Sequence, residues 1–81
     1  MDKSQMTKKL EEVISEVMPN IENINMTTAI VDGYGVNSVS LISIIVAAEN
    51  KFDVEFTDYE LALSEYDTFG DLLATIEEKL A

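Results

Sequence analysis

The 81-residue sequence lacks cysteine, histidine and arginine, and these absences exclude several kinds of chemistry. Without cysteine the chain forms no disulfide and offers no thiolate to a metal ion, a composition that suits a cytoplasmic protein. Without histidine it lacks the commonest general base of catalytic sites. Its paired carboxylates, such as Glu11–Glu12 and Glu77–Glu78, lie on helix faces predicted to be exposed, a poor setting for acid–base catalysis. We therefore expect no catalytic residues and no enzymatic activity of its own.

Long apolar segments and linker residues are also scarce. The longest uninterrupted apolar run, residues 44–48, is far shorter than the ~20 residues that span a bilayer. The first twelve residues contain no apolar core of a secretory signal, so we expect a cytoplasmic protein without membrane insertion. One proline, three glycines and no low-complexity tract leave no visible linker. The sequence predicts a single domain over residues 1–81.

Positive charge is rare: five lysines face 16 acidic residues, for a net charge of −11. The imbalance is strongest in residues 38–81, which carry ten acids and two lysines and therefore a net charge of −8. Such a chain repels nucleic acid and anionic membranes, is attracted to basic patches on other proteins, and is expected to stay monomeric. Asp32–Gly33 lacks the alternating ligands of a calcium loop, so we predict no metal site. Diffuse cation binding by the acidic surface stays open as an alternative.

Helical periodicity dominates the pattern of apolar residues. A first amphipathic helix, capped by Asp2 or Ser4, ends at Pro19. Residues 19–37 lack sustained periodicity and predict a long first loop, of a kind that is often functional or partly helical. We expect the apolar residues of this loop to pin it onto the core. The residues of the first helix face are Met6, Leu10, Val13, Ile14, Val17 and Met18, and those of the loop are Ile21, Ile24, Met26, Ile30 and Val31.

Two further helical segments follow the long helix that begins after Asn37. Thr57 and Glu60 stand in capping-box relation and predict a short helix over residues 58–63, and a strand at residues 54–56 would lack a partner. Asp67 or Thr68 caps the last helix. Its apolar face consists of Phe69, Leu72, Leu73, Ile76 and Leu80. The fold class is therefore all-α, a small four-helix bundle of three long helices and one short helix with a long first loop.

The helix over about residues 39–52 carries two apolar stripes. At ~100° per residue, one stripe clusters within roughly 100° of arc and suits the core. The second stripe is centred roughly 130° away. It is either buried as well or exposed to bind partners, and because burial on both sides is difficult in 81 residues, we expect exposure. The core stripe is Leu41, Ile44, Ile45, Ala48 and Phe52, and the second stripe is Val39, Ile42 and Val46.

Ser38 lies in the first turn of this helix, directly after the predicted N-cap Asn37. A helix N-terminus collects unpaired backbone N–H groups and the positive end of the helix dipole, so it favours an anion such as a phosphate ester. The sequence has no histidine to activate the serine, and the first lysine that follows it, Lys51, lies at the far end of the same helix. Ser38 is therefore interpreted as an attachment point rather than a nucleophile, while a simple capping serine remains the alternative on spacing alone.

The residues around Ser38 give the sequence a recognisable pattern. Gly-Val-Asn-Ser-Val-Ser-Leu at residues 35–41, followed by an apolar helix and by Ala-Glu-Asn-Lys-Phe-Asp-Val-Glu-Phe at residues 48–56, resembles the acyl and peptidyl carrier protein family. The spacing from Ser38 to Phe52 fits that family without a gap. Length, acidity and the order of the helices also agree, so the resemblance spans nearly the whole chain.

The resemblance implies a function. Ser38 matches the serine to which a phosphopantetheinyl transferase attaches 4′-phosphopantetheine from coenzyme A. The thiol of this covalent cofactor carries an acyl or aminoacyl group as a thioester between loading enzymes and synthase or transferase domains. Val39, Ile42 and Val46, the second stripe, match the positions at which the family docks its partners. Asn37, a helix cap, stands where the family most often has aspartate.

The departures from the family pattern bear on the pathway. Ser40 and Ser43 stand where carriers of fatty acid synthesis tend to have acids, and no charged residue lies between Asn37 and Ala48. Loss of these acids should shift partner recognition from charge to apolar contact. We therefore expect a stand-alone carrier of polyketide or nonribosomal peptide assembly. The alternatives are a carrier of housekeeping fatty acid synthesis and an interaction module whose Ser38 is never modified.

Overall fold

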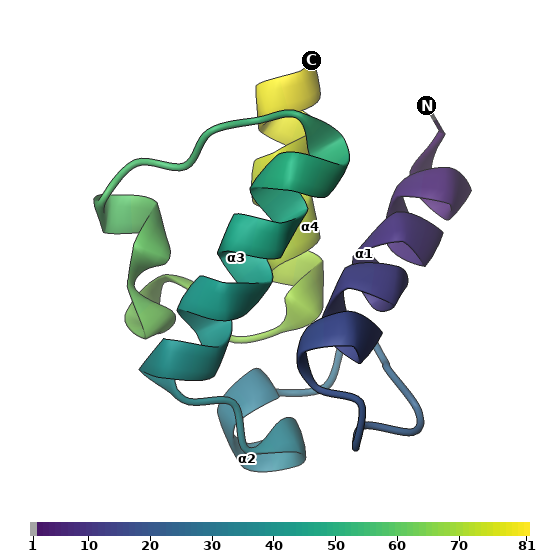
Figure 1. Ribbon diagram of the computed structural model, residues 1–81, viewed down its shortest axis with the longest axis vertical. Coiled ribbons are helices and arrows are strands. Elements are labelled where there is room, and N and C mark those ends of the chain that lie inside the picture. Colours follow the sequence, from purple (N-terminus) through teal and green to yellow (C-terminus); the bar gives the residue numbers. More distant parts are fainter. Residues whose placement is uncertain (1) are drawn as a thin grey trace.

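The computed structural model describes residues 2–81 and shows a small all-helical protein with four α-helices, three of them long. The three long helices lie side by side, and the short α2 lies at one end of the bundle, close to the start of α3 (Figure 1). In chain order the elements are α1 (Lys3–Val17), α2 (Ile30–Tyr34), α3 (Ser38–Phe52), the 3₁₀ turns η1 (Tyr59–Leu61) and η2 (Leu63–Glu65), and α4 (Phe69–Leu80). The all-α bundle expected from the sequence is confirmed.

Each long helix begins at a polar cap with reciprocal hydrogen bonds. Asp2, Asn37 and Thr68 accept a hydrogen bond from the backbone N–H three residues ahead, and the side chain at that position accepts one in return. These capping boxes satisfy N–H groups that the helices cannot pair internally. The three caps are among those predicted from the sequence, and they fix where each helix starts.

Within residues 2–81 the core consists of sixteen buried apolar residues, most of them from the three long helices. Five of them form the predicted core stripe of α3, which packs between α1 and the segment that leads to α4. The sequence did not indicate Val36 and Tyr66, which lie in the connecting segments and are 2% and 4% exposed. The complete set is Met6, Leu10, Val13, Ile14, Ile30, Val36, Leu41, Ile44, Ile45, Ala48, Phe52, Tyr66, Phe69, Leu72, Leu73 and Ile76.

Three local expectations are corrected by the structure. Residues 58–63 form no α-helix but parts of the two 3₁₀ turns η1 and η2, neither of which buries a residue. Leu61 and Leu63 pack against the core but are only partly buried, so the segment lacks the fully buried apolar face that usually stabilises a longer helix. In the first loop Ile30 is buried but Val31 is exposed, because the two are neighbours on the single turn of α2. Leu80 is also exposed, since the last turn of α4 extends past the core.

The first loop is held against the start of α4. The backbone N–H of Gly70 donates to the Met26 carbonyl at 2.9 Å, and the N–H of Ile30 donates to the Asp67 carbonyl at 2.9 Å. A Cβ placed on Gly70 would lie 2.8 Å from the Met26 oxygen, so only glycine allows this approach. Tyr34 stacks on Phe69 with ring centroids 5.5 Å apart. These contacts fix α2, and with it the direction from which the chain enters α3.

Candidate functional site

The entry into α3 is shaped by three consecutive residues. Gly35 ends α2 in the left-handed conformation, with φ of 67°, which glycine adopts without strain. Val36 is buried, and its N–H donates to the Ile30 carbonyl at 3.1 Å. Asn37 is extended, with φ of −109° and ψ of 178°, as an N-cap residue requires. This turn brings Ser38 to the surface as the first residue of α3.

The Asn37–Ser40 pair forms the cap of α3. Asn37 Oδ1 accepts the Ser40 N–H at 2.9 Å, and Ser40 Oγ accepts the Asn37 N–H at 3.0 Å. The Ser40 hydroxyl lies 3.0 Å from Asn37 Oδ1 and 3.2 Å from the Asn37 carbonyl oxygen, so it can donate to either. Ser40 therefore completes, without charge, a capping box in which glutamate or glutamine is the more usual partner.

Ser38 is exposed, and among residues 2–81 its hydroxyl forms no hydrogen bond. The hydrogen bonds of these residues also leave the backbone N–H groups of Ser38 and Val39 without an acceptor. The first turn of α3 contains no acidic residue. An anion attached to Ser38 would therefore meet free N–H donors, the positive end of a fifteen-residue helix and no opposing carboxylate in that turn.

No neighbouring group prepares the Ser38 hydroxyl for nucleophilic attack. The sequence contains no histidine, and the described residues place no general base in hydrogen-bond contact with the serine. No group of three or more acidic residues within residues 2–81 could hold a metal ion. The site has the properties of an acceptor for a group that another protein transfers.

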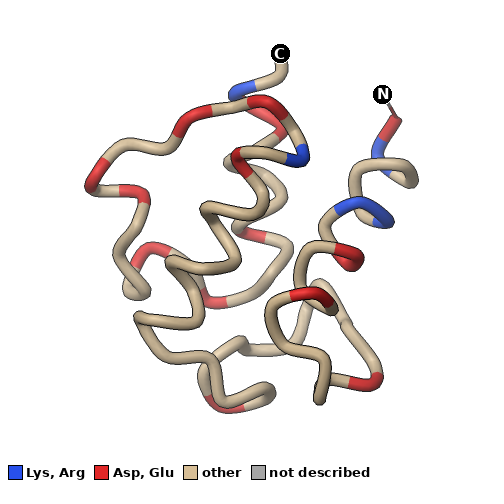
Figure 2. The backbone as a smooth tube through the Cα atoms, viewed as in Figure 1, with Lys and Arg blue, Asp and Glu red and all other residues tan. Residues whose placement is uncertain are grey.

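The two apolar stripes of α3 are separated as the sequence predicts. The core stripe is buried, whereas Val39, Ile42 and Val46 are 73%, 41% and 48% exposed. The helix carries no charge from Ser38 to Ala48, and the red and blue segments of the backbone tube avoid this stretch (Figure 2). α3 thus presents an exposed and uncharged apolar face, which we call the α3 face and define as Val39, Ile42 and Val46.

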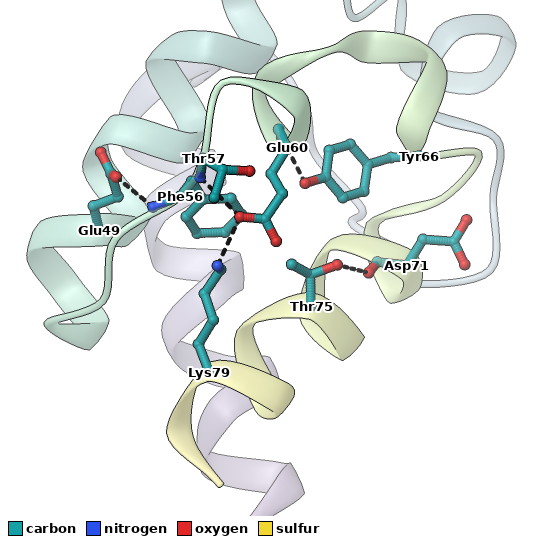
Figure 3. A network of polar contacts seen from close by, with 8 residues as sticks. All are labelled: Glu49, Phe56, Thr57, Glu60, Tyr66, Asp71, Thr75 and Lys79. Atoms are coloured by element: carbon teal, nitrogen blue, oxygen red, sulfur yellow. Dashed lines mark hydrogen bonds and ion pairs between the residues drawn. The ribbon is translucent and has the colours of Figure 1, made fainter.

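A polar network that the sequence only partly revealed holds the segment after α3 (Figure 3). Glu60 Oε1 accepts hydrogen bonds from the Thr57 N–H at 2.8 Å and from Lys79 Nζ at 2.7 Å, and the Glu60 carbonyl accepts the Tyr66 hydroxyl at 2.6 Å. The Lys79 ammonium also lies 4.9 Å from the centre of the Phe56 ring. The Thr57-x-x-Glu60 pattern predicts the first bond, but no sequence pattern predicts the bonds from Tyr66, six residues away, and from Lys79 of α4, 19 residues away.

The network changes the titration of two groups. The hydrogen bond from Lys79 and that from the Thr57 N–H hold the pKa of Glu60 below its usual value, against a smaller opposing effect of burial. Burial raises the pKa of Tyr66 to about 12, and the negative charge of Glu60 adds to this effect. Neither group contacts Ser38. The network therefore fastens η1 to the end of α4 and supports the fold beside α3, without a part in the chemistry of the site.

No helix within residues 2–81 is both long enough and apolar enough to cross a membrane. No solved structure matches this chain. A family model described as "Phosphopantetheine attachment site" matches residues 8–76, which is most of the chain. This match implies a covalent 4′-phosphopantetheine group. Members of the family are carriers without catalytic activity, modified by phosphopantetheinyl transferases and served by loading and synthase enzymes. The chain therefore belongs to the phosphopantetheine-binding family and is a carrier protein.

Proposed function

We propose that Ser38 is the residue to which 4′-phosphopantetheine is attached. The single observation that carries the proposal is the exposed, unpartnered Ser38 hydroxyl at the start of α3, inside the region that the family model matches. The residues around it fit the group: free N–H donors, a neutral first turn and open access all favour a phosphodiester at this position. When bound, the group supplies the thiol that the sequence lacks and on which cargo is held as a thioester.

The attachment step needs a partner enzyme. Ser38 Oγ forms a bond to the phosphorus that bears the pantetheine arm, and the pyrophosphate P–O bond of coenzyme A breaks, so the nucleotide leaves with its phosphates. The proton of the serine hydroxyl passes to a base of the transferase, because this chain has none at the site. The contribution of the chain is to hold Ser38 on a rigid helix start and to keep opposing charge away from it.

We further propose that the α3 face binds the enzymes that modify, load and unload the carrier. The support is its position on the same helix as Ser38, its exposure, and its lack of charge. An exposed apolar patch rimmed by polar residues is typical of protein interaction sites. Binding through such a face depends on desolvation of apolar side chains more than on charge pairing.

The neutral α3 face favours polyketide or nonribosomal peptide assembly over fatty acid synthesis as the pathway. Acids at positions 40 and 43 would suit basic grooves on partner enzymes, but this chain has serines there. Transfer from a cognate partner should therefore change little between low and moderate salt. A steep fall in the transfer rate as salt is added would contradict this proposal and favour a partner that recognises the carrier by its charge. Residues 1–81 acting as one stand-alone domain, a monomeric state and a cytoplasmic location stay predictions.

The attachment proposal is tested by intact-mass spectrometry. The protein is incubated with coenzyme A and a promiscuous phosphopantetheinyl transferase, and its mass is compared with that of Ser38→Ala and of Ser43→Ala. Ser43 is the matched control, since it is an exposed serine of the same helix. We expect one phosphopantetheine on the wild type and on Ser43→Ala and none on Ser38→Ala. Equal modification of Ser38→Ala, or none of the wild type, would refute the attachment at Ser38.

A further inference from the structure

The side-chain amide of Asn37 has a defined orientation. An amide oxygen has two lone pairs, and Asn37 Oδ1 faces two donors from Ser40, its N–H at 2.9 Å and its hydroxyl at 3.0 Å. The opposite orientation would direct the Asn37 NH₂ group at the Ser40 N–H, a contact between two donors. The hydrogen bonds to Ser40 therefore fix which side of the carboxamide carries the oxygen.

This orientation leaves the two N–H groups of Asn37 Nδ2 without a partner among residues 2–81. Asn37 directly precedes Ser38 in the chain, and both residues are exposed. An aspartate at this position would accept the same hydrogen bonds but would place a negative charge beside a phosphodiester on Ser38. Asparagine offers donors in place of that charge, next to a helix turn that contains no acid.

We propose that the Asn37 carboxamide, oriented by Ser40, donates a hydrogen bond to a phosphate oxygen of the arm on Ser38. Asn37 thus contacts the cofactor, and Ser40 is a positioning residue that acts through Asn37. The consequence is a restricted phosphate at the start of α3, from which the flexible part of the arm extends. This inference rests on the attachment to Ser38 proposed above and assigns the specific role of asparagine at this position.

The test compares ¹⁵N-labelled protein before and after attachment of the arm, with the attachment confirmed by intact mass. We expect the Asn37 Nδ2 proton signals to shift and their exchange with solvent to slow on modification, because they gain a phosphate acceptor. The side-chain amide of Asn50, exposed at the other end of α3, is the internal reference and should not change. In Ser40→Ala, which loses the hydroxyl, the shift and the slowing of exchange of the Asn37 Nδ2 protons should be smaller. In Ser43→Ala both should match the wild type.

Asn37→Asp supplies a second readout. Aspartate is an equally good cap, so the unmodified variant should fold. The change in melting temperature on modification should be less favourable in Asn37→Asp than in the wild type by a few degrees, because a donor has been replaced by a like charge. Ser43→Ala should again match the wild type.

The outcomes separate this inference from the attachment on which it rests. Unchanged Asn37 Nδ2 signals in fully modified wild-type protein would overturn the hydrogen bond alone, as would equal thermal shifts in wild type and Asn37→Asp. A response in Ser40→Ala equal to that of the wild type would overturn the positioning role of Ser40. Failure of the wild type to gain the arm at Ser38 would overturn both proposals, and intact mass identifies that case directly.

Discussion

Two isoleucines of α3 provide a direct test of whether one stripe of this helix belongs to the core and the other to an exposed face. Ile45 is fully buried in the core, whereas Ile42, three residues earlier on the same helix, is 41% exposed on the α3 face. Replacing each by alanine removes the same atoms from the same kind of helix position. Ile45→Ala should destabilise the fold by ~2–5 kcal/mol, because it removes buried methyl groups and leaves a cavity. Ile42→Ala should change stability by no more than ~1 kcal/mol, as is usual for surface changes.

These magnitudes are large relative to the stability of a small domain. For a chain of this length the expected free energy of unfolding is ~4–12 kcal/mol, calculated from ~0.05–0.15 kcal/mol per residue. Ile45→Ala should therefore lower the melting temperature by on the order of 10 °C or more, since each kcal/mol shifts it by ~4–8 °C in domains of this size. The loss could approach the whole stability of the protein, so measurements should begin at low temperature.

Urea denaturation followed by circular dichroism measures both variants. The midpoint of Ile45→Ala should fall while the denaturant slope stays constant, which identifies a change in stability rather than in compactness. Ile42→Ala and the stronger Ile42→Glu should keep a midpoint near that of the wild type but impair transfer to partner enzymes. If Ile42→Ala destabilises the fold as much as Ile45→Ala, the division of α3 into a core stripe and an exposed α3 face is refuted.

Three further predictions concern the rest of the molecule. The pKa of Glu60 is lower in the fold than its usual 4.5, so the stability that its carboxylate contributes is present above pH 4.5 and is lost as the pH falls through the folded pKa. Glu60→Gln should therefore flatten the dependence of the unfolding free energy on pH in this acidic range. An unchanged dependence would contradict the role assigned to Lys79. Gly70→Ala should destabilise the fold by ~1–3 kcal/mol in thermal melts, since the alanine Cβ would lie 2.8 Å from the Met26 oxygen. A gain in stability, from the higher helix propensity of alanine, would show that the first loop moves away from α4 at little cost. With a net charge of −11, the melting temperature should rise from low to moderate salt, and a constant value would mean that self-repulsion is negligible.

Much of the fold could be predicted because the informative residues act locally. The caps Asp2, Asn37 and Thr68 and the 3.6-residue periodicity each depend on residues within one or two turns. The two stripes of α3 were separable for the same reason. The expectation for Val31 is wrong because no local pattern shows that α2 turns Ile30 toward the core and its neighbour Val31 away from it. Leu80 continues the apolar face of α4 but is exposed, because the sequence does not show where the core ends along that helix.

The segment after α3 was the least predictable part of the chain. Its two 3₁₀ turns depend on Glu60 meeting Tyr66 and Lys79, and the latter lies 19 residues away in the sequence. Tyr66 can be buried because its hydroxyl donates a hydrogen bond to the Glu60 carbonyl, and the composition of the segment does not predict this partner. At the candidate site, the sequence placed Ser38 at the start of a helix and Asn37 as its cap. The reciprocal bonds of Ser40, which orient the Asn37 amide, became visible only in three dimensions.

The central claim is that the Ser38 hydroxyl carries the cofactor in the living cell. The most direct measurement is the intact mass of this protein isolated from cells that naturally produce it, followed by peptide mapping. We predict a population heavier by one phosphopantetheine, free or loaded with cargo, with the added mass on the peptide that contains Ser38. Protein that is always unmodified while a phosphopantetheinyl transferase is active in those cells, or modified at another residue, would contradict the account.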